Sequence, residues 1–557
     1  MMSRIVALRP VPRIVLLLLV AFASCNTTGC SGARETTPEV IAWTTDINRQ
    51  EPVGLRDGGD LRLPLMEFPV TLNPMHANAF TDTWPVTQAT SPRAFTIGQE
   101  GVPVVDSDYF SDIELTSVDP QVVTYRINPK AVWSDGMPIT WRDMDSQARA
   151  LSGENRTYTA NTTAGFSQVA SVRPGIDDRE AIVTFKKPYS EWRGMFSGGE
   201  TLLPQSITST PEAFNASALD MPSAGPFMVE RVDQAAKEIV LIRNPRWWGR
   251  PARLNSITFV AVWTDDQFGA LQDGRIDAMR VTNAYDLASA QLVDGVAIRH
   301  AREMRWTFLG FGGKPGNVLA DLPLRIAISQ GIDREAIVNV MQHGLVEYPA
   351  PPNSHFYAEA QRGYRDNVAE CECLSTIYDP DSARDQLDDM GWKLDGPVRQ
   401  KDGKKLVLND VFPDTRDDWG LATLLRDQLA EIGVELNLVN PDAPYFVEGN
   451  FDLTQYEIVG DGFPLKGLYD LYGSKGVFNG GKIGSESVDA AIEAAVTEPD
   501  ELRAQDLANA VDVELWREVH SAPLSQSMGF VAVRHDLANY GAFGTASIDF
   551  TAVGFTQ

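Results

Sequence analysis

A chain of 557 residues is too long to fold around one hydrophobic core, so we expect two or three domains. Hydrophobic residues make up 43% and charged residues 22% of it, which is typical of globular proteins and argues against long disorder. The formal net charge of −27 argues against nucleic acid or an anionic membrane surface as the main partner, because phosphate binding requires clustered lysine and arginine.

The first 24 residues predict a secretory signal peptide. Arg4, Arg9 and Arg13 form a basic region, and an apolar run follows from Ile14 to Ala23. At about 1.5 Å per helical residue this run covers only about half of a membrane core. It therefore predicts a signal-peptide core and not a membrane span.

Two cysteines follow this segment. The sequence Phe22-Ala23-Ser24-Cys25 resembles the lipobox of bacterial lipoproteins, which implies that Cys25 is acylated and becomes the first residue of the mature chain. Cys30, preceded by Gly29, is the alternative lipidation site, and an ordinary cleaved signal with incidental cysteines is a third interpretation. The polar residues 25–57 predict a lipidated, flexible tether between the membrane and a folded body.

The other two cysteines, Cys371 and Cys373, are separated by a single residue. This spacing does not favour a disulfide, whose Cα atoms usually lie about 5.5 Å apart. A metal site would need two further ligands, and a reactive or vicinal disulfide pair stays open, but we expect an ordinary loop. Because the sequence also lacks the nucleophile, phosphate-binding and metal signatures of enzymes, we expect no catalysis, no metal and no cofactor.

Alternating, β-branched runs predict strands along the chain. The first covers Asp60–Leu65, and others cover residues 122–127, 181–185 and 239–242. These strands do not follow the regular strand–helix rhythm of one parallel sheet, so we expect a mixed α/β architecture with several lobes.

The clearest helical patterns lie in the second half of the chain. Residues 322–341 predict two helices, with Asp333 as the N-cap of the second. Another helix is expected over residues 379–391, where Pro380 stands at the start and a glycine at the end. A third, over residues 419–432, leads into a strand over 434–438.

Nine short motifs occur in the order found in the extracellular solute-binding family that includes the dipeptide- and oligopeptide-binding proteins of ABC importers. The most specific, Trp133 to Thr140 followed by Asp143, resembles the pattern W-x-D-G-x-P-x-T of that family. The others cover residues 58–61, 72–74, 187–189, 225–227, 243–249, 271–277, 323–334 and 378–392. Each motif is weak alone, but together and in order they make the chain similar to this family, in its actinobacterial lipoprotein branch.

The resemblance implies an α/β, two-lobe fold like that of periplasmic binding proteins, of the large, cluster C type. Lobe one would comprise residues 58–305 and 524–557, with an extra subdomain at about residues 80–210. Lobe two would comprise residues 306–523. A two-strand hinge would join the lobes, which would close over a ligand without performing chemistry on it.

The resemblance also implies that Asp461 receives the α-ammonium group of a bound peptide. A carboxylate in a closing cleft forms a charge-assisted hydrogen bond to such a cation, which strengthens as water is expelled. Gly460 and Gly462 would let the backbone approach the ligand. The alternative is an Asp-Gly turn on the surface. Candidate aromatic walls of the cleft are Trp306, Phe308, Trp419 and Tyr445.

Two positions depart from the family pattern. Ile458 stands where relatives commonly have an aromatic residue, and residues 308–312 lack the asparagine that relatives carry in the first strand of lobe two. The loss of such polar groups favours a less polar or differently held ligand. An unpaired Asp461 would favour a cationic ligand, and an Asp461 paired with an arginine would favour a neutral or sugar ligand.

We therefore expect a monomeric solute-binding protein, lipid-anchored on the extracytoplasmic face of the cell membrane, that captures a peptide or peptide-like ligand for an ABC permease. An alternative function is compatible with the same fold, since a fold does not determine a function. In it, the protein is a sensor or accessory lipoprotein that binds a cell-envelope glycolipid head group and takes no part in transport.

Overall fold

The computed structural model describes residues 45–557, except 80–81, 100, 217–218, 360 and 442–444. The described residues belong to one compact unit. The expected signal peptide and both candidate lipidation sites, Cys25 and Cys30, lie outside the described residues. Within the described part of the chain, no helix has the length and apolar character that a membrane span requires.

Residues 45–57 were expected to belong to the flexible tether, and this part of the prediction is wrong. The backbones of Asp46 and Ala542 exchange two hydrogen bonds of 2.9 Å, and the Arg56 N–H donates to the carbonyl of Phe555 at 2.9 Å. A short 3-10 helix, η1 (Pro52–Gly54), lies between these contacts. The segment is ordered because its backbone groups find partners in the C-terminal segment instead of in water.

The described residues of lobe one form three sheets of three or four strands and two small two-stranded sheets, β2-β3 and β22-β23. The first has the strand order β1-β10-β9-β8, with β1 parallel to β10 and the other pairs antiparallel. Its strands are β1 (Asp60–Leu65), β10 (Ser256–Ala261), β9 (Glu238–Arg243) and β8 (Phe227–Asp233). The second, β11-β21-β12, consists of β11 (Ala278–Val281), β21 (Phe530–Arg534) and β12 (Val296–His300). The helices nearby are α1 (Thr83–Thr90), α5 (Gln267–Gln272) and α6 (Ala284–Ala290), and the remaining short strands are β2 (Phe95–Ile97), β3 (Pro103–Val105), β22 (Leu537–Ala538) and β23 (Gly554–Phe555).

The third sheet of lobe one lies within the expected subdomain. Its strands, in the order β4-β5-β7-β6, are β4 (Phe110–Val118), β5 (Gln121–Ile127), β7 (Glu180–Phe185) and β6 (Val169–Pro174). The helices of this part are α2 (Trp141–Ala150), α3 (Gln205–Thr208) and α4 (Pro211–Asn215). Thr140 and Asp143 form a capping box at the start of α2, so the most specific motif of the sequence builds a helix N-terminus.

Lobe two is built on a five-stranded sheet with the order β18-β17-β19-β13-β20. Its strands are β18 (Glu435–Val439), β17 (Val407–Val411), β19 (Leu453–Val459), β13 (Arg305–Phe311) and β20 (Ser521–Gln526). A smaller sheet comprises β14 (Lys393–Asp395), β15 (Val398–Lys401) and β16 (Lys404–Lys405). The helices are α7 (Leu322–Gln330), α8 (Arg334–Met341), α9 (Asn367–Cys371), α10 (Pro380–Asp389), α11 (Arg416–Glu431), α12 (Leu468–Tyr472), α13 (Glu486–Thr497) and α14 (Glu501–Arg517).

Several predicted elements of lobe two are confirmed. The helical region 322–341 is divided into α7 and α8, and Asp333 caps α8 by accepting a 2.9 Å hydrogen bond from the Ala336 N–H. Helix α11 begins three residues earlier than predicted because Thr415 caps it, accepting from the Asp418 N–H.

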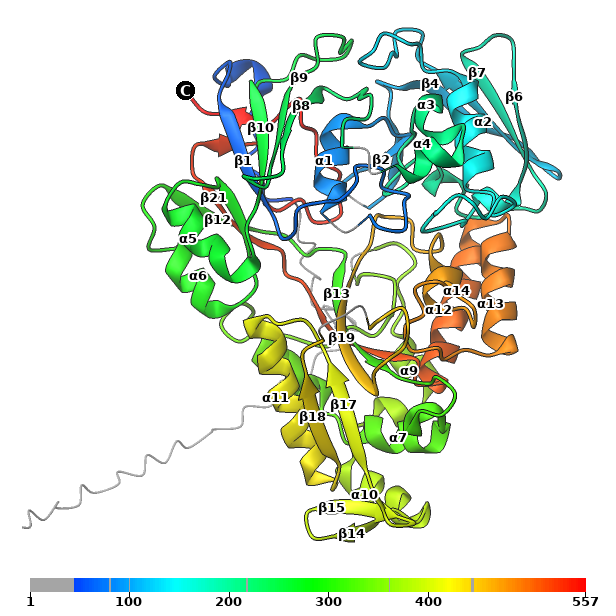
Figure 1. Ribbon diagram of the computed structural model, residues 1–557, viewed down its shortest axis with the longest axis vertical. Helices are drawn as coiled ribbons and strands as arrows, with labels where there is room; N and C mark the ends of the chain where they lie inside the picture. The colour runs from blue at the N-terminus through cyan, green and yellow to red at the C-terminus, as the bar shows by residue number, and fades with distance from the viewer. Residues whose placement is uncertain (1–44, 80–81, 100, 217–218, 360, 442–444) are drawn as a thin grey trace, which may run out of the picture. The chain divides into compact units, whose positions relative to one another are not determined.

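Two short chain segments connect the lobes. Residues 301–304 lead from β12 to β13, and residues 527–529 lead from β20 back to β21. They run side by side, since the Glu303 N–H donates to the Ser527 carbonyl at 3.0 Å and the Ser527 N–H donates to the Arg305 carbonyl at 2.9 Å. Figure 1 shows β13 and β19 continuing from this connection, with β12 and β21 above them and β17 and β18 below.

The pair Cys371 and Cys373 forms a disulfide, with Cα atoms 5.1 Å apart, so the expectation of an ordinary loop is wrong. Cys371 ends α9, and Glu372 takes a left-handed backbone conformation with a φ of 49°. This turn brings the two Cα atoms to a separation typical of disulfides, which the spacing in the sequence does not reveal.

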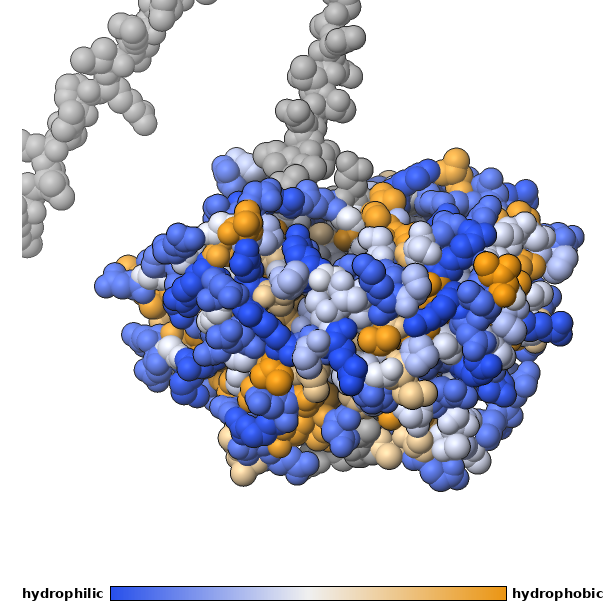
Figure 2. All heavy atoms as spheres, turned by 90° about the horizontal axis from the view of Figure 1, so that it is seen from above, coloured by the Kyte–Doolittle hydropathy of each residue, from blue (hydrophilic) through white to orange (hydrophobic). Residues whose placement is uncertain are grey.

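The face of the folded body in Figure 2 is mostly hydrophilic. Apolar residues form small separate groups on it. The hydrophilic character of this face agrees with the net charge of −27. The face carries no single large apolar patch of the kind that marks an obligate interface.

Candidate functional site

The segment that follows β19 carries the residues predicted to bind the ligand. The Gly460 N–H donates to the Met304 carbonyl at 2.7 Å, beside the connection between the lobes. A Cβ atom on Gly460 would lie 3.2 Å from the ring of Trp306, so the glycine lets the segment pack closely against this side chain. The structure thus brings Gly460 and Trp306 together, as the prediction of a shared site requires.

Asp461 comes next and connects lobe two to lobe one. Its Oδ2 atom accepts a hydrogen bond from the Gly199 N–H of lobe one at 3.3 Å. The same oxygen accepts from Nζ of Lys466, and Oδ1 accepts from the Phe463 N–H at 3.2 Å. The carboxylate is therefore paired within the chain, with the ammonium group of Lys466 and not with an arginine.

Glycines from both lobes allow this close contact. Gly462 has a φ of +90°, and a Cβ atom there would lie 2.5 Å from the side chain of Ile97 in lobe one. In lobe one, Gly198 has a φ of +53°, and its Cβ atom would lie 2.3 Å from Oδ2 of Asp461. The close approach at Gly462 is thus to the opposite lobe, and the predicted approach to a ligand stays a prediction.

Two buried glutamates of lobe one face Lys466. Oε1 of Glu200 lies 3.9 Å from its Nζ atom, and Oε2 of Glu191 accepts a 3.1 Å hydrogen bond from the Leu465 N–H. The side chain of Lys466 is only 10% exposed and that of Glu200 only 7%. We call Glu191, Glu200, Asp461 and Lys466 the inter-lobe cluster.

The electrostatics of this cluster follow from burial and an excess of acidic groups. Burial raises the pKa of Glu191 to about 7 and that of Glu200 to about 8. Burial alone would lower the pKa of Lys466, but the carboxylates of Asp461 and Glu200 outweigh it and raise that pKa. Lys466 is therefore a stable cation between the lobes, while the two glutamates hold protons more strongly than exposed carboxyl groups do.

Apolar and backbone contacts extend the junction. The Phe463 side chain of lobe two is 3% exposed and belongs to the hydrophobic core of the subdomain in lobe one. Ser190 of lobe one reaches the end of α13, where its Oγ contacts the carbonyls of Ala495 and Glu498 at 2.7 Å each. In Figure 1, α13 and α14 lie against the loops of this subdomain. The structure therefore describes two lobes in mutual contact.

The other predicted wall residues lie apart from Asp461. Phe308 is fully buried in lobe two and stacks on Tyr456, with ring centroids 5.4 Å apart. Trp419 is 39% exposed on α11, where its indole Nε1 donates to Asp414 at 2.6 Å. Tyr445 packs edge-on against Phe451. The structure groups Trp306 with residues 460–462 but shows no contact of Trp419 or Tyr445 with them among the described residues.

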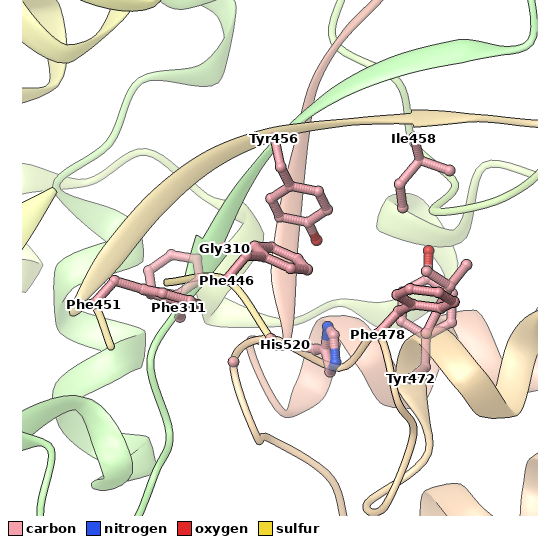
Figure 3. A pocket seen from close by; sticks show the side chains of 12 residues that line it. Gly310, Phe311, Phe446, Phe451, Tyr456, Ile458, Tyr472, Phe478 and His520 are labelled. Atoms are coloured by element: carbon pink, nitrogen blue, oxygen red, sulfur yellow. The ribbon is translucent and has the colours of Figure 1, made fainter. Parts of the chain in front are cut away.

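An aromatic pocket lies on the face of β13 and β19 that carries Phe308 and Tyr456 (Figure 3). It is lined by Gly310, Phe311, Phe446, Phe451, Tyr456, Ile458, Leu471, Tyr472, Phe478, Gly480, Gly481 and His520. Its volume of about 10 Å³ leaves room for about one water molecule. Burial lowers the pKa of His520 to about 3, so this side chain is neutral, and its Nε2 atom has no partner among the described residues. Ile458, singled out by its departure from the family pattern, is part of this wall.

A second hollow of about 540 Å³ lies elsewhere on lobe two, beside Lys314, Asn409 and Asp452. Neither hollow includes a residue of the inter-lobe cluster. No group of three or more histidine, cysteine, aspartate or glutamate side chains suited to a metal ion occurs in the part of the chain that the structure describes.

Sequence reasoning missed Lys466, Glu191 and Glu200. Lys466 stands in the apolar run Phe463-Pro464-Leu465-Lys466-Gly467-Leu468, and a lone charge within such a run is the one local signal for a buried lysine. No local signal marks the two glutamates, because their burial depends on a segment far away in the sequence.

Comparisons with known proteins agree with this architecture. The family model for bacterial extracellular solute-binding proteins, family 5, middle part, matches residues 107–480. The chain is 47% identical to the oligopeptide-binding protein OppA of Mycobacterium tuberculosis over 525 residues, covering 93% of this chain and 88% of that protein. It is 29% identical over 261 residues to the probable monoacyl phosphatidylinositol tetramannoside-binding protein LpqW of the same organism, covering 43% of this chain and 38% of that protein.

Among solved structures, the periplasmic EDTA-binding protein EppA superposes with a TM-score of 0.83 at 22% identity, covering 94% of this chain and 100% of that one. This likeness shows the fold and confirms the predicted two-lobe, periplasmic-binding-protein-like architecture. The matched family is one of binding proteins and not of enzymes. The family model matches more than half of the chain, and the chain belongs to family 5 of the bacterial extracellular solute-binding proteins.

Proposed function

We propose that this protein captures oligopeptides between its two lobes and delivers them to an ABC permease. The observation that carries the proposal is the 47% identity to an oligopeptide-binding protein over 93% of the chain, which spans both lobes. The geometry supports it, because two adjacent connecting segments form a hinge and the lobes meet at the inter-lobe cluster. Hinge closure around a ligand is the motion that such an arrangement allows.

The ligand site is proposed to include Trp306 and the segment Gly460–Gly462. These residues lie beside the segments that connect the lobes, so a ligand bound there would contact both lobes at once. The ammonium contact expected for Asp461 stays a prediction. Phe308, Trp419 and Tyr445 stay candidate contacts for parts of a ligand that extend away from Asp461. Trp419 lies on α11, and Phe308 stacks on Tyr456 beside the aromatic pocket.

We further propose that the mature protein is a monomer anchored by a lipid on Cys25, or on Cys30 if the later site is used. Either anchor would hold the folded body close to its permease. Mass spectrometry of the N-terminal peptide from the membrane fraction would identify the acylated cysteine. An N-terminus that is cleaved and carries no lipid would contradict the anchor.

A glycolipid head group is the second candidate ligand. It is favoured by the partial similarity to LpqW and by the pairing of Asp461 with a cation of the chain, which reduces the need for a cationic ligand. In this case the protein would act as an accessory lipoprotein without a transport role.

One experiment separates the two ligands. The protein is purified from its native host, denatured, and the released small molecules are identified by mass spectrometry. Peptides support import, and a mannosylated lipid supports the accessory role. Hydrogen exchange with and without a defined peptide mixture then tests closure, because a bound peptide should slow exchange in segments 187–200 and 460–470 of both lobes. Unchanged exchange in either lobe would contradict capture by closure.

A further inference from the structure

We propose that Lys466 is a specificity-determining residue that supplies the cation of the closed cleft, so that the protein binds peptides with and without a free N-terminal ammonium group. The inference rests on the proposed function, because it defines which peptides the same site accepts. It follows from the contacts of Asp461 and from the charges buried around Lys466.

The acceptor capacity of Asp461 is largely used by its own chain. Oδ2 accepts from Lys466 Nζ and from the Gly199 N–H, and Oδ1 accepts from the Phe463 N–H. A carboxylate has about four lone-pair positions, so a ligand ammonium would have to use the one that is left or displace Lys466.

Displacement is unfavourable because Lys466 is itself buried between the lobes. Its side chain is 10% exposed, and its ammonium group lies 5.6 Å from the centre of the Phe463 ring. Removing one partner of a buried ion pair leaves an uncompensated charge, which is strongly destabilising. The ion pair of Asp461 and Lys466 is therefore kept when the lobes close. A ligand can bind without placing a positive charge next to the Asp461 carboxylate.

The glutamates around Lys466 explain why the chain supplies this cation permanently. Glu191, Glu200 and Asp461 place three carboxyl groups around a single ammonium group, and Oε2 of Glu200 has no partner among the described residues. Asp470 adds a further acidic side chain, held by the Thr162 hydroxyl of lobe one at 2.7 Å. Without Lys466, closure would bury these acidic groups with no cation between them, so closure would need either further proton uptake by the glutamates or a cationic ligand beside Asp461.

The test compares one peptide mixture in two chemical forms. The full-length protein is offered an equimolar set of synthetic tri- to pentapeptides and the same set after N-acetylation. Native mass spectrometry ranks the bound species, and calorimetry gives the dissociation constant of the best-bound peptide in both forms. We expect acetylation to change the affinity of the wild type by less than about threefold, since no ammonium contact is lost.

Three variants give matched comparisons. Lys466→Met should prefer the free amine over the acetylated peptide by at least about tenfold, because the ligand then supplies the missing cation. Lys466→Arg keeps the charge and should behave as the wild type does. Lys187→Met removes an exposed lysine that pairs with Glu493 across the same lobes at 2.8 Å, and it should also leave the two forms equivalent.

The wild-type comparison needs no variant, so the proposal stays testable even if Lys466→Met does not fold. A loss of about tenfold or more on acetylation of peptides bound by the wild type would overturn the proposal and assign the ammonium contact to Asp461. An equal preference of Lys466→Met and wild type for free amines would overturn it as well. If the wild type bound neither form, the proposed peptide function itself would be contradicted, and this inference with it.

Discussion

Glu200 of lobe one places a carboxyl oxygen 3.9 Å from the ammonium nitrogen of Lys466 in lobe two, at a junction where both side chains are at least nine-tenths buried. Burial raises the pKa of Glu200 from an ordinary 4.5 to about 8, and that of the neighbouring Glu191 to about 7. When the lobes separate, water reaches these groups and their pKa values return toward the ordinary value. The contact between the lobes is therefore linked to proton uptake.

The first prediction is that peptide affinity falls as the pH rises. The raised pKa values belong to the closed state, so closure is fully favoured below about pH 4.5 and weakens as the pH rises through about 7 to 8. Within this window each linked proton lowers the affinity by up to about tenfold per pH unit. Glu200→Gln carries no titratable proton, so calorimetric titrations from pH 5 to 8.5 should show a smaller slope for this variant.

The control for this prediction is Glu493→Gln, which alters a half-exposed carboxylate in an inter-lobe pair with Lys187. Its slope should equal that of the wild type. Equal slopes for the wild type and Glu200→Gln would mean that Glu200 does not exchange a proton when the lobes close.

The second prediction concerns the stability of lobe two. Asp410 on β17 is fully buried and accepts a 2.8 Å hydrogen bond from Gln455 of β19, while its Oδ1 atom and Oε1 of Gln455 have no partner among the described residues. Burial raises the pKa of Asp410 to about 7. The native state thus binds a proton that the unfolded chain releases above the ordinary value of 3.8. This contribution to stability is complete at low pH and is lost as the pH rises through about 7.

Asp410→Asn should remove this dependence. An amide at this position donates to Gln455 Oε1 and accepts from Gln455 Nε2, so both side chains are satisfied at every pH. We expect the variant to be more stable than the wild type at pH 8, by on the order of 4 kcal/mol for a shift of about three pKa units, and equally stable near pH 4. Denaturant unfolding at the two pH values measures this difference. The exposed Asp427→Asn should have no effect, and a variant less stable than the wild type at pH 8 would refute the protonated state of Asp410.

Local features of this fold could be predicted because their determinants lie within a few residues of each other. The capping interaction of Asp333 with Ala336 and the capping box of Thr140 with Asp143 each depend on residues three positions apart. Strand β1 (Asp60–Leu65) coincides with its predicted range, since apolar residues alternate along it. The start of α11 was missed because Thr415 was not recognised as its N-cap.

The candidate site could be predicted only in part. The resemblance to the family predicts a ligand contact at Gly460–Gly462, and this segment lies at the junction of the lobes in the structure. The partners of Asp461 were not predictable, because Gly199 comes from the other lobe and the lone charge of Lys466 in an apolar run does not reveal which carboxylate it pairs with. The disulfide at Cys371 depends on the left-handed turn at Glu372, which side-chain types do not specify.

The third prediction uses the glycine at the lobe junction. A Cβ atom on Gly462 would lie 2.5 Å from the Ile97 side chain of the opposite lobe, a distance that requires this buried side chain or the lobe that carries it to shift. We expect Gly462→Ala to weaken peptide binding by at least about tenfold, because the methyl group obstructs the closed state. Gly316→Ala separates this effect from backbone strain, since Gly316 has a similar φ of +95° and open space around it. Equal affinities of the two variants in calorimetry would show that strain, and not contact between the lobes, is responsible.

The fourth prediction tests whether Phe463 links the lobes. Its side chain is 3% exposed and packs in the core of the subdomain in lobe one, although Phe463 belongs to lobe two. Opening the lobes would expose the ring. Truncating it should therefore destabilise the closed state relative to the open state, while the free energy of unfolding of lobe two changes little. We expect Phe463→Ala to weaken peptide binding by roughly thirtyfold, which corresponds to about 2 kcal/mol of lost burial.

The same reasoning predicts how the unliganded Phe463→Ala protein differs from the wild type. Small-angle scattering should show a larger radius of gyration, since the separated lobes become more populated when the apolar contact is lost. Phe463→Leu, which keeps most of the apolar surface, should lie between the two in both affinity and dimensions. Tyr469→Ala alters a 42% exposed aromatic side chain on α12 and should change neither measurement. If Phe463→Ala lowered the unfolding temperature strongly while affinity per folded molecule stayed the same, Phe463 would be a folding residue and not a contact of the closed state.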